Sequence, residues 1–107
     1  MHLSENEQRA IHAFKTRLEE KYGQVILILF GSKARGDGSA ESDIDLLVLM
    51  ERTVDIALES QIFRIGFEIE LEYDVVLGLI VMNSAYWDST GRQMPLRWNI
   101  DREGIAV

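Results

Sequence analysis

The sequence contains no cysteine and a single proline, and its apolar runs are short. The absence of cysteine excludes disulfide bonds and thiolate metal sites. A spanning helix needs roughly 18 consecutive apolar residues, and a secretory leader needs a basic segment before an apolar run. Neither pattern occurs, so we expect a cytoplasmic protein.

Basic residues are also in the minority, with 11 lysines and arginines against 18 acidic residues and a formal net charge of −7. Such a chain repels phosphate backbones as a whole, so we do not expect direct binding of nucleic acid. Hydrophobic residues make up 47% of the chain and charged residues 27%, a balance that argues against disorder. At 107 residues the chain has room for one modest core. We therefore predict that residues 1–107 form a single domain.

Local patterns predict alternating helices and strands. Ser4 and Glu7 fit a capping box, and the apolar spacing that follows predicts a helix ending near Gly23. Residues 25–30 form a continuous apolar run, which is typical of a strand covered on both faces, and residues 44–50 are predicted to form a second strand. Thr53 is expected to cap a second helix, whose core-facing stripe comprises Leu58, Ile62, Ile65 and Ile69.

The remaining third of the chain predicts less regular structure. Residues 73–81 are rich in β-branched side chains and predict a third strand. Residues 83–91 are polar and are expected to form a loop, and residues 93–107 suggest a short helix followed by an apolar tail. Together these elements predict an α/β (α+β) fold in which helices pack against a small mixed β-sheet.

A glycine and a serine follow the first predicted strand directly. Gly31 allows the backbone to approach a ligand closely, and the free amides of such a turn, with the Ser32 hydroxyl, suit a triphosphate. Lys33 and Arg35 are near enough in sequence to add positive charge. On these residues alone, an ordinary turn with two solvated cations is the more frequent outcome.

Two aspartates at the start of the second predicted strand are more specific. Side chains two residues apart in a strand share a face, so Asp43 and Asp45 project together. Adjacent carboxylates do not ionise side by side without compensation, and Mg²⁺ or Mn²⁺ with hard oxygen ligands would supply it. For an isolated pair of this kind, two exposed acids at the strand edge remain the simpler interpretation.

Asp74 lies at the start of the third predicted strand, where β-propensity does not favour aspartate. Three carboxylates at adjacent strand ends could hold two metal ions, and Asp74 could accept the proton of an attacking hydroxyl. Glu72 competes for this role, and an exposed acid is the alternative for both. The enzyme interpretation fails if the carboxyl of Asp74 lies on the far side of the sheet from those of Asp43 and Asp45.

The segment from Gly31-Ser32 through ten residues to Asp43-Ile44-Asp45 resembles the signature of the polymerase-β-like nucleotidyltransferase superfamily, in its minimal nucleotidyltransferase branch. The resemblance implies a nucleotidyltransferase-type core over most of the chain. It implies that Gly31, Ser32 and Arg35 bind the triphosphate, and that the three aspartates hold the metals and catalyse transfer. Lys33 stands where relatives often have arginine, so its contact with phosphate is left open.

The resemblance points to antitoxins that pair with a toxin ribonuclease of the HEPN type and adenylylate one of its tyrosines. It implies ATP as donor, Mg²⁺ or Mn²⁺ as cofactor, and a hetero-oligomer with the toxin. The alternatives are an enzyme with a small-molecule acceptor, such as an aminoglycoside, and a binding module that neutralises by occlusion. Three apolar residues near the end could form a docking surface, although core positions are more common: Trp87, Met94 and Trp98.

Overall fold

The computed structural model describes residues 3–39 and 41–107. Four strands form one mixed sheet in the order β3-β2-β1-β4. Along the chain the helices and strands are α1 (Glu5–Tyr22), β1 (Ile26–Phe30), α2 (Gly31–Arg35), β2 (Ile44–Met50), α3 (Ile56–Tyr73), β3 (Leu77–Asn83), α4 (Ser84–Asp88), the 3₁₀ helix η1 (Thr90–Gln93), α5 (Pro95–Glu103) and β4 (Ile105–Ala106). The predicted α/β class with a small mixed sheet is confirmed.

The first helix follows the sequence signals closely. Ser4 accepts a hydrogen bond from the Glu7 amide, and the Glu7 carboxylate accepts one from the Ser4 amide, which completes the capping box. The helix ends at Gly23, whose φ of 81° is in the region that favours glycine. These local signals set both ends of α1, and its apolar residues then pack on the sheet.

The sheet combines both strand orientations. β1 runs antiparallel to β2 with Phe30 opposite Asp45, while β2 runs parallel to β3 with Asp45 beside Gly78. The central strand β2 is buried along nearly its whole length, as expected for a strand that is apolar from Leu46 to Met50. The polar exception is Asp45, which lies near the start of the strand, where the sheet meets solvent.

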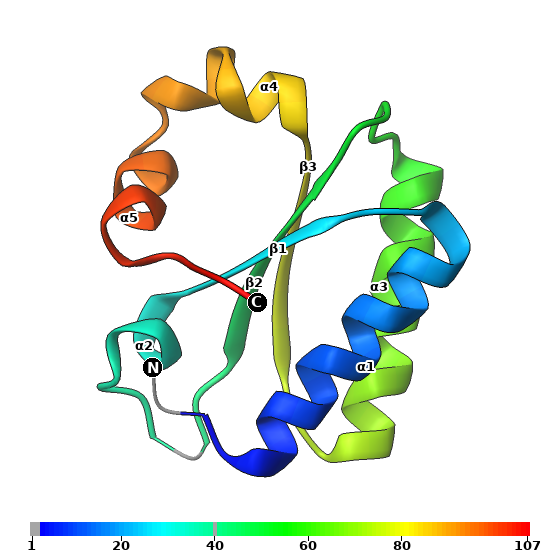
Figure 1. Cartoon of the computed structure of the whole chain (residues 1–107), viewed down its shortest axis with the longest axis vertical. Coiled ribbons are helices and arrows are strands. Elements are labelled where there is room, and N and C mark those ends of the chain that lie inside the picture. The colour runs from blue at the N-terminus through cyan, green and yellow to red at the C-terminus, as the bar shows by residue number, and fades with distance from the viewer. Residues whose placement is uncertain (1–2, 40) are drawn as a thin grey trace.

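Two apolar layers cover the two faces of the sheet. On one face α1 and α3 lie side by side over the larger core, whose central members include Phe14, Leu46 and Ile62. On the other face α4 and α5 enclose a smaller cluster that includes Leu47, Trp87 and Ile100 (Figure 1). Because side chains alternate along β2, Asp45 projects on the same face as Leu47, toward the α4 and α5 layer.

Several predicted boundaries are wrong. Asp55, and not Thr53, caps α3, because its carboxylate accepts a hydrogen bond of 2.8 Å from the Leu58 amide. The helix continues to Tyr73, so β3 begins only at Leu77. The predicted loop over 83–91 contains α4, whose amino terminus is capped by the side chain of Asn83. The turn predicted at Gly31-Ser32 is the start of α2.

The tail is more ordered than the sequence predicts. Pro95 opens α5, where its missing amide has no helical partner to lose. After Gly104 the chain adds a short strand to the sheet edge, with Ile105 opposite Leu29 and Ala106 opposite Ile28 of β1. The tail thereby lies against the strand that leads into Gly31.

Candidate active site

Asp43 and Asp45 lie at the entry to β2, as the sequence predicts. Asp43 is exposed just before the strand, and Asp45 is half-buried within it. The first turn of α2 follows β1 directly, and β1 pairs with β2 so that Phe30 is opposite Asp45. The antiparallel pairing therefore brings the Gly31-Ser32 turn next to the aspartates, although ten residues separate Ser32 from Asp43.

Two glycines make room for the Asp45 carboxylate. A Cβ atom at Gly78 would lie 2.5 Å from one carboxylate oxygen of Asp45, and a Cβ at Gly31 would overlap the other. Gly31 also has a φ of 75°, which other residues adopt only with strain. The Asp45 carboxylate therefore occupies a slot between two backbones, and we call this the glycine slot. A glycine inside a strand often marks such a close approach, so the sequence does carry a signal for Gly78.

The electrostatic surroundings of Asp45 oppose its ionisation. Burial raises the pKa of Asp45, the neighbouring Asp43 charge raises it further and Glu103 adds to the effect, while Arg35 lowers it. A divalent cation between the two aspartates would relieve this repulsion, and carboxylate oxygens are the ligands that Mg²⁺ and Mn²⁺ prefer. The donor set of Asp43 and Asp45 therefore fits a hard metal ion.

Arg35 places a guanidinium beside the same turn. Its side chain is about half exposed and pairs with Asp37 at 3.1 Å and with Glu103 at 3.2 Å. Ser32 lies in the first turn of α2, where its backbone carbonyl accepts hydrogen bonds from Gly36 and Asp37. Gly31, Ser32 and Arg35 are thus gathered at one place, as the sequence predicts, and they offer amide, hydroxyl and cationic donors.

Glu103 is a site residue that the sequence did not reveal. Its carboxylate accepts hydrogen bonds from the Gly31 amide at 3.2 Å and from Arg35. The contact exists because β4 pairs with β1, which brings the end of α5 alongside Gly31. A local sequence pattern cannot predict a contact between Gly31 and Glu103, which are 72 positions apart.

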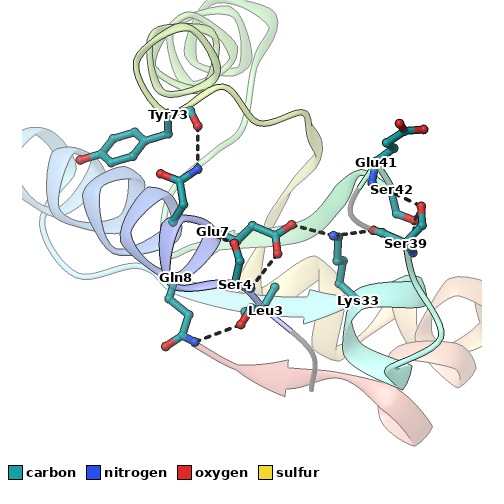
Figure 2. Close-up of polar contacts among 10 residues, drawn as sticks. Leu3, Ser4, Glu7, Gln8, Lys33, Ser39, Glu41, Ser42 and Tyr73 are labelled. Carbon is teal, nitrogen blue, oxygen red and sulfur yellow. Dashed lines mark hydrogen bonds and ion pairs between the residues drawn. The ribbon is translucent and has the colours of Figure 1, made fainter.

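Lys33 does not point toward the turn. Its side chain is 3% exposed, and its ammonium lies 2.6 Å from the Glu7 carboxylate and 2.7 Å from the Ser39 carbonyl. Figure 2 shows Lys33 reaching between α1 and the loop that precedes β2. Lys33 therefore braces this loop against the start of α1, which leaves Arg35 as the cation beside Gly31.

Asp74 does not join the other two aspartates, and the predicted three-carboxylate cluster is not formed. Asp74 is the C-cap of α3, with a φ of 54°. It is exposed and lines a hollow of about 430 Å³ with Asn6 and Ser42. Within residues 3–39 and 41–107, no three acidic or histidine side chains are placed to share a metal ion.

The physical reason is the length of α3. The sequence suggested a strand from residue 73, but the helix continues to Tyr73, whose carbonyl accepts a hydrogen bond of 2.8 Å from the Asn6 side chain. The chain then needs Val75 and Val76 to reach the sheet, and Gly78 becomes the β3 residue beside Asp45. Glu72, the competing candidate, lies in the last turn of α3 and pairs with Arg17.

The apolar residues of the tail divide between core and surface. Trp87 is buried in the second cluster, where the Arg97 guanidinium lies over its ring, whereas Trp98 is exposed on α5. Among the described residues, no helix is both long and apolar enough to cross a membrane.

A family comparison and a search of known proteins both find nucleotidyltransferases. Residues 11–94 match the protein family described as "Nucleotidyltransferase domain". The protein of Methanocaldococcus jannaschii named "Putative protein adenylyltransferase MJ0604" is 40% identical over 78 residues, which cover 71% of this chain and 73% of that protein. A second protein of the same organism, "Putative protein adenylyltransferase MJ0141", is 38% identical over 66 residues, covering 62% and 65%.

Two solved structures share the fold. A chain in the crystal structure of a mutant MntA-HpeT toxin-antitoxin has a TM-score of 0.60 and 21% identity, over 99% of this chain and 72% of that one. A chain in a toxin-antitoxin structure with AMP-PNP has a TM-score of 0.59 and 19% identity, over 92% and 70%. At these identities the likeness extends to the fold alone.

Proposed function

Because this chain belongs to the nucleotidyltransferase domain family, we propose that it transfers AMP from ATP to a tyrosine hydroxyl of a HEPN-type toxin and so acts as the antitoxin. The observation that carries the proposal is the placement of Asp43 and Asp45 at one strand end, beside the Gly31-Ser32 turn. This arrangement brings candidate metal ligands next to candidate triphosphate donors.

Each residue of the site has a proposed part. Asp43 and Asp45 would hold Mg²⁺ or Mn²⁺, which supplies charge neutralisation at the phosphate oxygens when it is bound. The Gly31 amide, the Ser32 hydroxyl and the Arg35 guanidinium would bind the triphosphate and orient it. The glycine slot would fix the Asp45 carboxylate in the orientation that ligation requires.

The proposed acceptor is a protein. Support comes from the 40% identical relative, whose name is that of a protein adenylyltransferase, and from the fold shared with chains of toxin-antitoxin structures. In this proposal residues 1–107 act as one catalytic domain in the cytoplasm, and the toxin presents its tyrosine to the open end of the sheet. Exposed Trp98 on α5 is a candidate contact for that partner.

The proposal is tested by co-expression with a small helical protein encoded in a neighbouring reading frame. Intact-mass measurement of the purified partner should reveal the added mass of AMP with the wild-type chain and none with Asp45→Asn. Asp37→Asn is the matched control, because Asp37 is an exposed acid that pairs with Arg35 but lies outside β2. This control should leave modification intact.

The remaining outcomes separate the alternatives. If the Asp45→Asn variant still neutralises the partner in cells without modifying it, neutralisation occurs by occlusion. A partner that is neither modified nor neutralised, together with adenylylation of an aminoglycoside, would indicate a small-molecule acceptor. Either result would overturn the antitoxin proposal in its enzymatic form.

A further inference from the structure

The Glu103 carboxylate is an anion bound to the donors beside the Gly31-Ser32 turn. One of its oxygens accepts the Gly31 amide at 3.2 Å, and both accept from Nη1 of Arg35, at 3.4 and 3.2 Å. The Glu103 side chain is only 16% exposed, so the contact is largely buried, unlike a solvent-exposed ion pair. The amide of Gly31 and the guanidinium of Arg35 are two of the three donors assigned above to the triphosphate.

The backbone holds Glu103 in this position. Ile105 pairs with Leu29 in the sheet, two residues after Glu103 and two residues before Gly31. The Gly104 amide donates to the Ile100 carbonyl at 2.7 Å, which ends α5 where the carboxylate meets the turn. Strand pairing therefore fixes the backbone near Glu103 beside β1, which brings its side chain within reach of the Gly31 amide.

The charges make simultaneous occupancy unfavourable. The Glu103 carboxylate already places a negative charge on the Gly31 amide and the Arg35 guanidinium before a nucleotide enters. A triphosphate that takes the same donors brings more negative charge and competes for the same hydrogens. An amide hydrogen aimed at one carboxylate oxygen cannot also make a good bond to a phosphate oxygen.

We propose that Glu103 is a built-in competitor for the triphosphate, which holds the Gly31 amide and Arg35 in the nucleotide-free protein and releases them when a polyphosphate binds. This inference rests on the proposed function, because that function assigns the triphosphate to these donors. The carboxylate keeps the donors ordered while the site is empty, and its release lowers the net gain on binding. Nucleotide affinity is thus set partly by the tail of the chain.

The test compares three proteins in calorimetric titrations with inorganic tripolyphosphate and with ATP in the presence of Mg²⁺. Glu103→Gln removes the charge but keeps an oxygen for the Gly31 amide, and it should bind both ligands about tenfold more tightly than wild type, a change of about 1.4 kcal/mol. Asp37→Asn is the matched control, because it also removes a carboxylate from Arg35 but none from Gly31. It should stay within about twofold of wild type, since exposed ion pairs contribute little.

Thermal unfolding gives a second readout that a purely structural role would not produce. Glu103→Gln should unfold at a lower temperature than wild type without ligand and show the larger rise on adding ATP and Mg²⁺. Glu103→Asp, whose shorter side chain keeps the charge but loses reach, should behave in the same direction. Binding that is unchanged or weaker in Glu103→Gln would overturn the proposal and make Glu103 a positioning residue for Arg35.

The outcome is separable from that of the proposed function. Tripolyphosphate binding reports on the competition without any transfer reaction. If the wild-type chain modifies its partner but Glu103→Gln binds polyphosphate no more tightly, the competitor proposal alone fails. If Glu103→Gln binds polyphosphate more tightly but no protein variant transfers AMP to any partner, the enzymatic proposal alone fails.

Discussion

Replacing Gly78 with alanine should separate catalysis from stability. The added Cβ would lie 2.5 Å from an Asp45 carboxylate oxygen, where ordinary contacts begin near 3.4 Å, so the carboxylate must turn away. Misplacement of a catalytic group on the order of 1 Å costs roughly 100-fold in rate. We therefore expect AMP transfer to fall by about two orders of magnitude.

The same substitution should not harm folding. Gly78 is not among the glycines with positive φ, and its strand conformation suits alanine, which is favoured over glycine there by about 0.5 to 1 kcal/mol. Relief of the clash requires only rotation of the half-buried Asp45 side chain. The free energy of unfolding, measured in urea, should therefore stay within about 1 kcal/mol of the wild-type value.

Gly23→Ala provides the reciprocal control. Gly23 has a φ of 81° and no atom within 4 Å of an added Cβ, so alanine there is strained without touching the site. It should lower the free energy of unfolding by about 1 to 3 kcal/mol and leave transfer unchanged. Mn²⁺ binding, followed by electron paramagnetic resonance, gives a readout that needs no partner and should weaken only in Gly78→Ala. A folded Gly78→Ala protein with wild-type transfer and Mn²⁺ affinity would refute the glycine slot as a functional feature.

Three further predictions concern residues around the site. Asp74→Asn should keep transfer within about threefold of wild type, because asparagine tolerates the left-handed conformation and Asp74 lies apart from Asp45; a loss as large as that of Asp45→Asn would restore Asp74 as the base. Lys33→Met should lower the free energy of unfolding by about 3 to 5 kcal/mol in denaturant titrations, because it leaves Glu7 without its cation, whereas a change below about 1 kcal/mol would mean that the pair is dispensable. Burial raises the pKa of Glu7, but bonds from Lys33 and Ser4 outweigh it and leave the pKa below its ordinary 4.5, so this stabilisation is complete above about pH 4.5 and is lost as the pH falls through the lowered value. The free energy of unfolding should therefore depend less on pH across that range in Glu7→Gln than in the wild type. An identical pH dependence in both proteins would contradict this prediction.

The elements that the sequence predicts well are those whose signals are local. The capping box of Ser4 and Glu7 specifies the start of α1 by itself, and the apolar residues of β2 from Leu46 to Met50 require cover on both faces. Asp43 and Asp45 follow from the same logic, because alternation along a strand places them on one face. This half of the site was predictable before any tertiary contact was known.

The caps of α3 and α4 were missed although their contacts are local, whereas the end of α3 and the position of Glu103 depend on contacts outside any one sequence pattern. The end of α3 is fixed by the Asn6 side chain at the Tyr73 carbonyl and by Glu70, whose carboxylate accepts the Leu77 amide at 2.8 Å. Residue propensity predicts a strand at Val75 and Val76 because both are β-branched, and it takes no account of these hydrogen bonds. The contact of Glu103 with Gly31 likewise needs the pairing of β4 with β1, which no window of sequence contains.

The attachment of β4 has a practical consequence for work with this protein. The Val107 amide donates to the Leu27 carbonyl, and the Lys15 ammonium bonds the Val107 carbonyl, so the last residues are pinned to the strand behind the turn. A purification tag or fluorescent fusion joined after Val107 would pull on this anchor and, through it, on Glu103. Tags are better placed before α1, with a linker long enough to leave Ser4 undisturbed.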